Sequence, residues 1–275
     1  MRRPTRGFFN VRPAQAPMAP PATHASVRGF EKIADAYERG RPGYPAAALD
    51  YLRSSLGVLP RDLVVELGAG TGKFTRAIGA WDARVVAVEP LAGMRAVFRR
   101  TVRGTDLVAG AAESIPVQTA RADAVVVAQS FHWFRQPAAV NELARVLVPE
   151  GHVGLVWNVR DESTGWPKEL GAIIDAESGA IPRARDGKWR EAFASSDRFD
   201  PLVLRSFPHE QHADRGTVVD RVLSISAIGL LPEDRRAEIA ERVLALLDTH
   251  PSTRGRATVA LPYRTDVYTA RRRPD

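Results

Sequence analysis

Residues 64–73 of the chain read Val-Val-Glu-Leu-Gly-Ala-Gly-Thr-Gly-Lys. A short apolar run ends in Glu66, and glycine then occupies every second position through Gly72. A second apolar run, at residues 85–88, ends in another acid, Glu89. Glycines let a backbone turn tightly and approach a ligand, and a carboxylate at a strand end can accept both hydroxyls of a ribose. The pattern predicts a strand, a glycine turn and a helix that together bind a nucleoside cofactor.

The spacing of the glycines discriminates between three kinds of cofactor. A dinucleotide motif requires G-x-G-x-x-G, but the third glycine comes one residue early here and Lys73 takes its place. A phosphate loop requires G-x-x-x-x-G-K-S/T, but Leu67 stands at its first glycine and Phe74 follows Lys73. The form E/D-x-G-x-G-x-G is matched by Glu66, Gly68, Gly70 and Gly72. It resembles motif I of the class I S-adenosylmethionine-dependent methyltransferases. A glycine-rich turn that binds no ligand is the alternative.

The composition is that of an ordinary globular protein. The 275-residue chain is 44% apolar and 26% charged, which suits one large domain or two small ones. No apolar run approaches membrane-spanning length, so we expect no membrane partner. Without cysteine there are no disulfides or thiolate metal sites. His209 and His212 are too closely spaced for the H-E-x-x-H motif, so no metal is predicted.

The net charge of +7 raises the question of a nucleic-acid partner. Only four of the 39 basic residues are lysine, which indicates a chain-wide bias toward arginine. The arginines are scattered except at the two ends, where basic tails are usually solvated. We therefore expect a small-molecule partner rather than a nucleic acid. The sequence does not indicate an oligomeric state.

Residues 1–25 are rich in proline, alanine and arginine. Such a segment cannot bury a core, so we expect it to be disordered and residues 26–275 to form the folded domain. No apolar stretch of secretory-signal length follows the first arginines, so we expect a cytoplasmic protein. Met18 is a second candidate start of translation, which the intact mass of natively expressed protein tests.

Predicted helices and strands alternate from residue 30 onward. Apolar runs predict strands at residues 63–67, 84–88, 106–109, 123–128 and 152–157. Helices are predicted at residues 30–37, 46–56, 71–81, 92–100 and 137–148. This alternation indicates an α/β fold with a largely parallel sheet covered on both faces. Ligands bind beyond the carboxyl ends of such strands. The residues that follow predicted strands are Gly68, Glu89, Gln129 and Asn158.

The second half of the chain is less regular. We expect residues 162–250 to form a helical region on the substrate side. Within it, residues 162–200 are predicted to be helical with interruptions at Pro167 and Pro182, and further helices are predicted at 217–229 and 232–249. Residues 259–268 are predicted to be a hairpin or a strand that completes the sheet.

Residues 28–160 resemble class I methyltransferases of the methyltransferase-11 type, and most of all the branch that includes trans-aconitate methyltransferases. Besides motif I, the resemblance rests on Tyr37 with Arg41-Pro42-x-Tyr44-Pro45, on Ser130-Phe131-His132-Trp133-Phe134, and on Val156-Trp157-Asn158 with Arg160. It implies a Rossmann-like, doubly wound, seven-stranded sheet that is mostly parallel with its last strand antiparallel. It also implies S-adenosylmethionine as the cofactor.

The resemblance assigns cofactor-binding roles by position. Glu89 would accept both ribose hydroxyls. The residues that would cradle the methionine portion are Glu66 and the turn formed by Gly68, Ala69, Gly70 and Gly72.

Four more positions are candidates on the adenine side and at the reaction centre. Ala112 and Glu113 lie where the family places an acid near the adenine amino group, although Glu113 also suits a helix cap. Met94 either packs near the adenine or belongs to the core. Gln129 would line the methionine carboxylate or the reaction centre.

Aromatic rings within about 6 Å can stabilise the cationic sulfonium of the cofactor. Tyr37, Tyr44, Phe131 and Trp133 are candidates, with ordinary packing as the alternative for each. His132 is the candidate catalytic base for a hydroxyl acceptor, because its reference pKa suits that work. A structural histidine fits the sequence equally well.

Methyl transfer from a sulfonium is an in-line displacement. Proximity and alignment supply on the order of 7–11 kcal/mol, so a dedicated base is not obligatory. Arg41 and Arg160 would hold a carboxylate of the acceptor through bidentate contacts, with surface positions as the alternative. Tyr44 and Trp133 are further candidates for substrate contact. We therefore expect O-methylation of a small molecule at a carboxylate or a hydroxyl.

Three other functions stay open. Enzymes that methylate exocyclic amines commonly carry Asn/Asp-Pro-Pro-Tyr after the fourth strand, where this chain has Ala128-Gln129-Ser130-Phe131. That difference argues against N-methylation of bases or glutamine but leaves other RNA or protein acceptors open. A cofactor-binding protein without catalysis is the second. A nucleotide-dependent oxidoreductase is the third, and the glycine spacing disfavours it.

Overall fold

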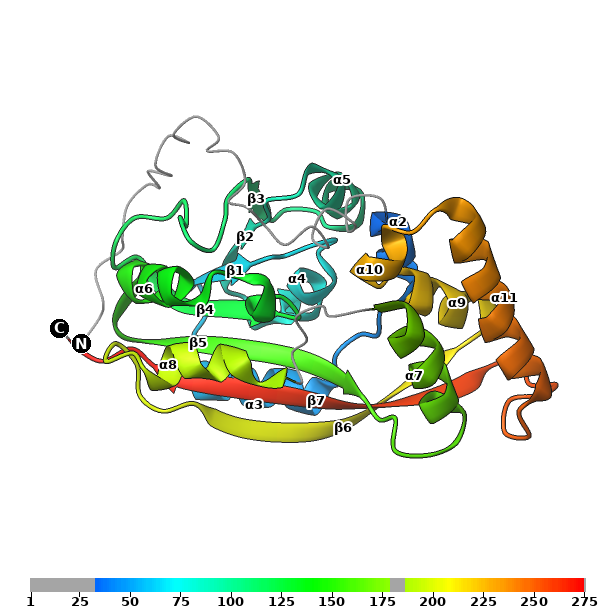
Figure 1. Cartoon of the computed structure of the whole chain (residues 1–275). Helices are drawn as coiled ribbons and strands as arrows, with labels where there is room; N and C mark the ends of the chain where they lie inside the picture. Colours follow the sequence, from blue (N-terminus) through cyan, green and yellow to red (C-terminus); the bar gives the residue numbers. More distant parts are fainter. Residues whose placement is uncertain (1–32, 179–185, 275) are drawn as a thin grey trace.

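The computed structural model describes residues 33–178 and 186–274. At its centre is a seven-stranded sheet in the order β3-β2-β1-β4-β5-β7-β6 (Figure 1). The first five strands pair in parallel, whereas β7 runs antiparallel to both of its neighbours. The strands are β1 (Leu63–Leu67), β2 (Arg84–Val88), β3 (Asp106–Val108), β4 (Ala122–Ala128), β5 (Leu147–Arg160), β6 (Val203–Ala213) and β7 (Val259–Arg271). The mostly parallel sheet with an antiparallel last strand is confirmed.

The central strands β1 and β4 are almost continuous runs of apolar residues. All five residues of β1 are buried, which is typical of a parallel strand with both faces covered. Successive side chains of β1 enter different cores: Val65 packs on one side of the sheet and Val64 on the other. The apolar run predicted this strand correctly.

Helices cover both faces of the sheet. On the side of Val65 the core includes residues of α6 (Gln136–Val146), η5 (Lys188–Arg190) and α8 (Glu191–Ala194). On the side of Val64 it includes residues of α3 (Ala46–Leu56), α4 (Lys73–Ala77) and η2 (Gly79–Trp81). The remaining elements near the sheet are α5 (Ala92–Thr101) and the short η3 (Phe131–Trp133).

A second group of helices lies beyond the end of β5 (Figure 1). Its apolar core joins four helices to the first residues of β7, including Leu261 and Tyr263. This helical group sits past the carboxyl ends of the parallel strands, where the sheet is expected to bind its ligands. Its members are α2 (Ala34–Gly40) and the four helices of the apolar core, α7 (Gly165–Ser178), α9 (Arg215–Leu223), α10 (Ser226–Gly229) and α11 (Glu233–Thr249).

The structure differs from the sequence prediction in the region 162–250. This region was expected to be helical, but it also contributes the edge strand β6. Most of β6 is exposed and polar, so it lacks the apolar run that identifies a buried strand, and its Pro208 is tolerated at an edge. Pro167 does not interrupt a helix, because it lies in the first turn of α7.

Some predictions fall outside the described residues. These are the disordered tail at residues 1–25, the first residues of the helix at 30–37, and the interruption at Pro182. In the two stretches that the structure describes, no helix combines the length and the apolar character that crossing a membrane requires.

Candidate active site

The glycine turn after β1 has a left-handed backbone at three positions. The φ angles are +67° at Gly68, +58° at Gly70 and +83° at Gly72, a region that side-chain-bearing residues rarely adopt. The amides of Gly68 and Ala69 donate to the carbonyl of Val88, at 2.8 and 3.2 Å. The turn is therefore fixed to the end of β2.

The three glycines meet different surroundings. A Cβ at Gly68 would lie 2.6 Å from the Ser130 hydroxyl, and one at Gly72 would lie 2.3 Å from a methyl of Val102. A Cβ at Gly70 would meet nothing within 4 Å. Gly68 and Gly72 are thus required by neighbouring side chains, whereas Gly70 faces open space that a ligand can occupy.

Glu66 is a buried acid at the base of this turn, with 1% of its surface exposed. Its carboxylate accepts a 2.6 Å hydrogen bond from the Thr75 hydroxyl. Burial raises the pKa of Glu66 to about 8, and the charge of Glu89 adds to the rise. A cation placed beside Glu66 would favour its ionised form.

Glu89 lies at the end of β2 and is also buried, at 4% exposure. One carboxylate oxygen accepts from the Gly70 amide at 2.8 Å and the other accepts from the Leu91 amide at 2.9 Å. These two bonds orient the Glu89 carboxylate between the glycine turn and the residue before α5.

One polar atom of the turn is buried without a hydrogen-bond partner, the hydroxyl of Thr71. Such atoms are rare in folded proteins unless a ligand or water satisfies them. Together with the open space at Gly70 and the two acids, Thr71 makes the turn fit a nucleoside that carries an amino-acid group. S-adenosylmethionine has that composition.

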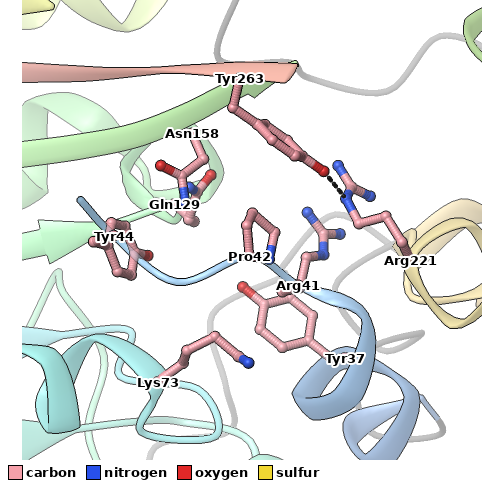
Figure 2. A pocket seen from close by; sticks show the side chains of 9 residues that line it. All are labelled: Tyr37, Arg41, Pro42, Tyr44, Lys73, Gln129, Asn158, Arg221 and Tyr263. Carbon is pink, nitrogen blue, oxygen red and sulfur yellow. Dashed lines mark hydrogen bonds between the residues drawn. The ribbon is translucent and has the colours of Figure 1, made fainter. Parts of the chain in front are cut away.

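A pocket opens beside the turn (Figure 2). It lies between the sheet and the helical group, and it is lined by Tyr37, Arg41, Pro42, Tyr44, Lys73, Gln129, Asn158, Arg221 and Tyr263. Four of these positions were predicted as site residues from the sequence: Tyr37, Arg41, Tyr44 and Gln129. The fold brings them together from the α2–α3 segment and the end of β4.

Gln129 has an unusual backbone for a residue with a side chain. Its φ is +62°, and its amide donates to the carbonyl of Val156 at 2.8 Å. Its side chain shares a hydrogen bond with Tyr44. Backbone strain of this kind clusters at functional sites. The conformation aims the side chain of Gln129 into the pocket (Figure 2).

Tyr44 is held by Gln129 and by Phe74, whose ring meets it edge-on with 4.9 Å between centroids. Burial raises the pKa of Tyr44 well above its usual value, and the charges of Tyr37 and Glu66 act in the same direction. The hydroxyl therefore stays protonated and is available as a hydrogen-bond donor in the pocket.

Arg41 is anchored to the helical group. Its Nε donates to the Ser224 hydroxyl at 3.1 Å and its Nη2 donates to the Ser224 carbonyl at 3.0 Å. Its guanidinium also lies over the ring of Tyr37, 4.7 Å from the centroid. Burial, followed by the charge of Arg221, lowers the pKa of Arg41 to about 10, so it remains a cation at neutral pH.

Comparison with known proteins assigns this architecture to a family. Residues 65–155 match a family described as a methyltransferase domain. An uncharacterized methyltransferase of Mycobacterium tuberculosis is 37% identical over 234 residues, which cover 85% of this chain and 91% of that protein. An uncharacterized methyltransferase-like protein of Schizosaccharomyces pombe is 30% identical over 254 residues, 92% of this chain and 99% of that one.

The chain belongs to the class I methyltransferases. Its cofactor is S-adenosylmethionine, as the glycine motif predicts. Among solved structures, a putative methyltransferase from an antibiotic biosynthesis pathway of Anabaena variabilis shares the fold, with a TM-score of 0.60 at 16% identity. The match covers 83% of this chain and 98% of that one. The narrower resemblance to trans-aconitate methyltransferases remains a prediction.

The adenine-side candidates of the methyltransferase have structural partners. Glu113 accepts a 2.7 Å hydrogen bond from the amide of Arg135, the residue before α6. Ala112 is buried in the sheet core. Met94 is buried at 3% exposure beside Tyr37 and Leu91. The contacts of Glu113 and Met94 fit the capping and packing alternatives, and their adenine roles remain predictions.

His132 and Trp133 lie on η3, outside the residues that line the pocket. The Nδ1 of His132 accepts from the indole of Trp157 at 3.3 Å, and the His132 ring lies 4.9 Å from that of Trp133. Burial lowers the pKa of His132 to about 4, so the imidazole is neutral at physiological pH. With Nδ1 accepting, a neutral ring carries its proton on Nε2.

Arg160 also lies outside the pocket lining. Its Nε donates to Glu162 at 2.8 Å, its Nη2 contacts the same carboxylate, and 8% of its side chain is exposed. Its Nη1 is buried without a hydrogen-bond partner. The side chain of Arg160 is therefore largely enclosed, unlike that of the surface arginine that the sequence left open.

Sequence reasoning missed three residues that line the pocket: Lys73, Arg221 and Tyr263. Arg221 and Tyr263 belong to α9 and β7, far along the chain from motif I, and no local pattern marks them. Lys73 was noticed only as an exception to the dinucleotide spacing. In the described parts of the chain, no three His, Asp or Glu side chains are placed to hold a metal ion.

Proposed function

We propose that this methyltransferase transfers a methyl group to an oxygen of a small-molecule acceptor bound in the pocket of Figure 2. The observation that carries the proposal is the lining of that pocket. Hydrogen-bonding groups from Tyr44, Gln129 and Asn158 face cationic side chains from Arg41 and Arg221 within one small enclosure. This combination suits a small, polar and negatively charged molecule.

We further propose that the glycine turn and its two acids hold the cofactor. Glu66 would receive its ammonium, Gly70 would lie against it, and Glu89 would accept the ribose hydroxyls. The buried carboxylates and the open space at Gly70 support these roles. Tyr37 and Tyr44 would then border the transfer region, since both line the pocket.

When bound, S-adenosylmethionine supplies a methyl group on a cationic sulfonium, which needs only an aligned nucleophile. The residues of the protein would bind the acceptor and orient its oxygen toward that methyl group. Gln129 and the protonated Tyr44 would fix the oxygen that is methylated, while Arg41 would hold negative charge. Enclosure by the helical group would exclude water and strengthen these contacts.

A carboxylate is the acceptor oxygen that this geometry favours over a hydroxyl. A hydroxyl acceptor reacts faster when a base takes its proton, and His132 is the candidate for that role. Its Nδ1 is engaged by Trp157 and its pKa is about 4, so it is a weak base. A carboxylate needs no base. Trp133 packs against His132 outside the lining of this pocket, so its contact with the substrate stays a prediction from the sequence.

The cofactor roles can be tested by calorimetry. We expect the wild type to bind S-adenosylmethionine and S-adenosylhomocysteine but not NAD. Glu89→Gln should weaken binding by about 100-fold, because two hydrogen bonds to a charged acceptor are worth about 3 kcal/mol. Glu150→Gln, an exposed acid at another part of the sheet, is the matched control. Unchanged affinity in Glu89→Gln would remove the ribose role.

The acceptor can be found with a labelled-methyl screen over small carboxylic acids, hydroxyl compounds, phenols, RNA and protein. We expect label in small acids, released by alkali as methanol because a methyl ester hydrolyses and an ether does not. Label in RNA or protein alone would replace the proposal. Cofactor binding without any transfer would indicate a non-catalytic protein. The cytoplasmic location belongs to the same proposal, and cell fractionation tests it.

A further inference from the structure

Two arginines from distant parts of the chain, Arg41 and Arg221, line the end of the pocket formed by the helical group. A third, Arg160, lies outside the lining and pairs with the pocket residue Tyr263 across β5 and β7. Arg41 follows α2, Arg160 ends β5, and Arg221 lies on α9. The charge of Arg221 lowers the pKa of both Arg41 and Arg160, and the charge of Arg160 lowers the pKa of Arg41, which is the direction expected of neighbouring cations. We call these residues the arginine cluster.

Close backbone packing places Arg41 beside Arg221. A Cβ at Gly40 would lie 2.3 Å from the backbone nitrogen of Arg221, so the end of α2 nearly touches α9. The Ser224 hydroxyl and carbonyl then tether Arg41 to the end of α9. The positions of Arg41 and Arg221 are therefore set by the packing of α2 against α9 and do not depend on flexible surface side chains.

Two members of the arginine cluster have unused hydrogen-bond donors. Within the described part of the chain, the Nη1 atoms of Arg160 and Arg221 are buried without a partner, although Arg160 contacts Glu162 and Arg221 donates from Nε to the Tyr263 hydroxyl at 3.0 Å. Arg221 is 8% exposed, and so is the side chain of Arg160. A buried guanidinium donor without an acceptor is unfavourable, so we expect a hydrogen-bond acceptor from a ligand at both atoms.

The charges near the arginine cluster do not balance. Glu162 pairs with Arg160, while Arg41 and Arg221 contact only neutral groups in the hydrogen bonds described: Ser224 and Tyr263. The nearby Asp220 is engaged by Arg39. Among residues 33–178 and 186–274, the hydrogen bonds set three guanidinium charges against one carboxylate, an excess of two positive charges.

We propose that the arginine cluster binds a dianionic group of the methyl acceptor, either a phosphate monoester or a pair of carboxylates, apart from the oxygen that is methylated. Figure 2 shows Tyr44 and Gln129 on one side of the pocket and Arg221 on the other, with Arg41 between them. The acceptor spans this distance. The inference rests on the proposed function, and it names Arg221 as the residue that selects the charged end.

Binding measurements test the arginine cluster without knowledge of the natural acceptor. Inorganic phosphate, succinate and acetate are titrated by calorimetry into the full chain, with and without S-adenosylhomocysteine. We expect phosphate or succinate to bind at least tenfold more tightly than acetate, because only dianions match the excess charge. Tighter binding of phosphate identifies a phosphate monoester, and tighter binding of succinate identifies two carboxylates.

Variants of the arginine cluster test whether the dianion binds there. Arg221→Gln should weaken dianion binding at least tenfold and leave the affinity for S-adenosylhomocysteine within twofold. Arg39→Gln is the matched control: it also joins α2 to α9 but is exposed, and it should change neither affinity. If Arg221→Gln loses S-adenosylhomocysteine binding through misfolding, Arg160→Gln supplies the same comparison.

The two proposals fail in different ways. Equal binding of acetate and the dianions, or unchanged dianion binding in Arg221→Gln and Arg160→Gln, overturns the arginine cluster as an anion site. Failure to bind S-adenosylhomocysteine, with dianion binding intact, overturns the cofactor assignment and leaves the anion site standing.

Discussion

Glu66 is buried and has a carboxyl pKa of about 8, so the stability of the cofactor-free protein depends on pH. Its usual pKa is 4.5. Between these two values the folded, cofactor-free protein keeps a proton that the unfolded chain has released. Stability from this group is therefore complete below pH 4.5 and is lost as the pH rises toward 8, by at most about 1.4 kcal/mol per unit.

We expect Glu66→Gln to flatten this dependence. Urea unfolding of the cofactor-free wild type should give a lower free energy of unfolding at pH 8 than at pH 6. The difference should be smaller in Glu66→Gln, because the amide does not titrate. Parallel profiles for the two proteins would show that Glu66 ionises normally in the folded state.

At the scale of elements, the glycine turn allows two requirements for glycine to be tested separately: tight packing of the protein and space for the cofactor. Gly70 and Gly72 both have a positive φ, so alanine at either costs about 1–2 kcal/mol of backbone strain. Gly72→Ala also forces a Cβ against Val102, which adds about 1–3 kcal/mol. Gly70→Ala meets no protein atom and instead fills the space assigned to the cofactor.

The two alanine variants should therefore fail differently. We expect Gly70→Ala to stay folded and to bind S-adenosylhomocysteine at least tenfold more weakly, and Gly72→Ala to lose more stability. Thermal unfolding and calorimetry on the same samples measure both effects. Normal cofactor affinity in Gly70→Ala would mean that the ligand does not approach this side of the turn.

The contact between α2 and α9 is a second element-scale feature. Gly40→Ala should destabilise the protein by about 1–3 kcal/mol, because its methyl group would overlap the backbone at Arg221. Gly43→Ala, three residues beyond the end of the same helix, has no atom within 4 Å of its Cβ and serves as the control. Equal melting temperatures for the two variants would contradict the close approach of these helices.

At the scale of the whole molecule, a ligand that binds the folded protein but not the unfolded chain stabilises the entire fold, and we expect S-adenosylhomocysteine to be such a ligand. At 100 times its dissociation constant, S-adenosylhomocysteine should add about 2.7 kcal/mol. For a chain of this size that corresponds to a rise in melting temperature of about 5–10 °C. Differential scanning fluorimetry measures the shift. NAD at the same concentration should produce none, and an equal shift with NAD would oppose the cofactor assignment.

Local patterns predicted most of the sheet but not its edge. The strands β1, β2 and β4 are runs of apolar residues that need burial on both faces, so their sequence alone identifies them. The edge strand β6 has one partner and exposed side chains, and its pairing with β7 is what makes it a strand. The pairing joins two segments that are separated in the chain by a helical region, so no local sequence pattern predicts it.

The same distinction holds for the site. The sequence by itself determined the glycine turn, Glu66 and Glu89, because the geometry of a strand followed by a tight turn fixes them locally. Only the tertiary structure decided that Arg41 meets Arg221, 180 positions further along the chain, and that both approach Arg160. Their meeting depends on the order of the strands and on the packing of α2 against α9. The proposed cofactor site can therefore be recognised in the sequence, whereas the proposed acceptor site forms only once the chain has folded.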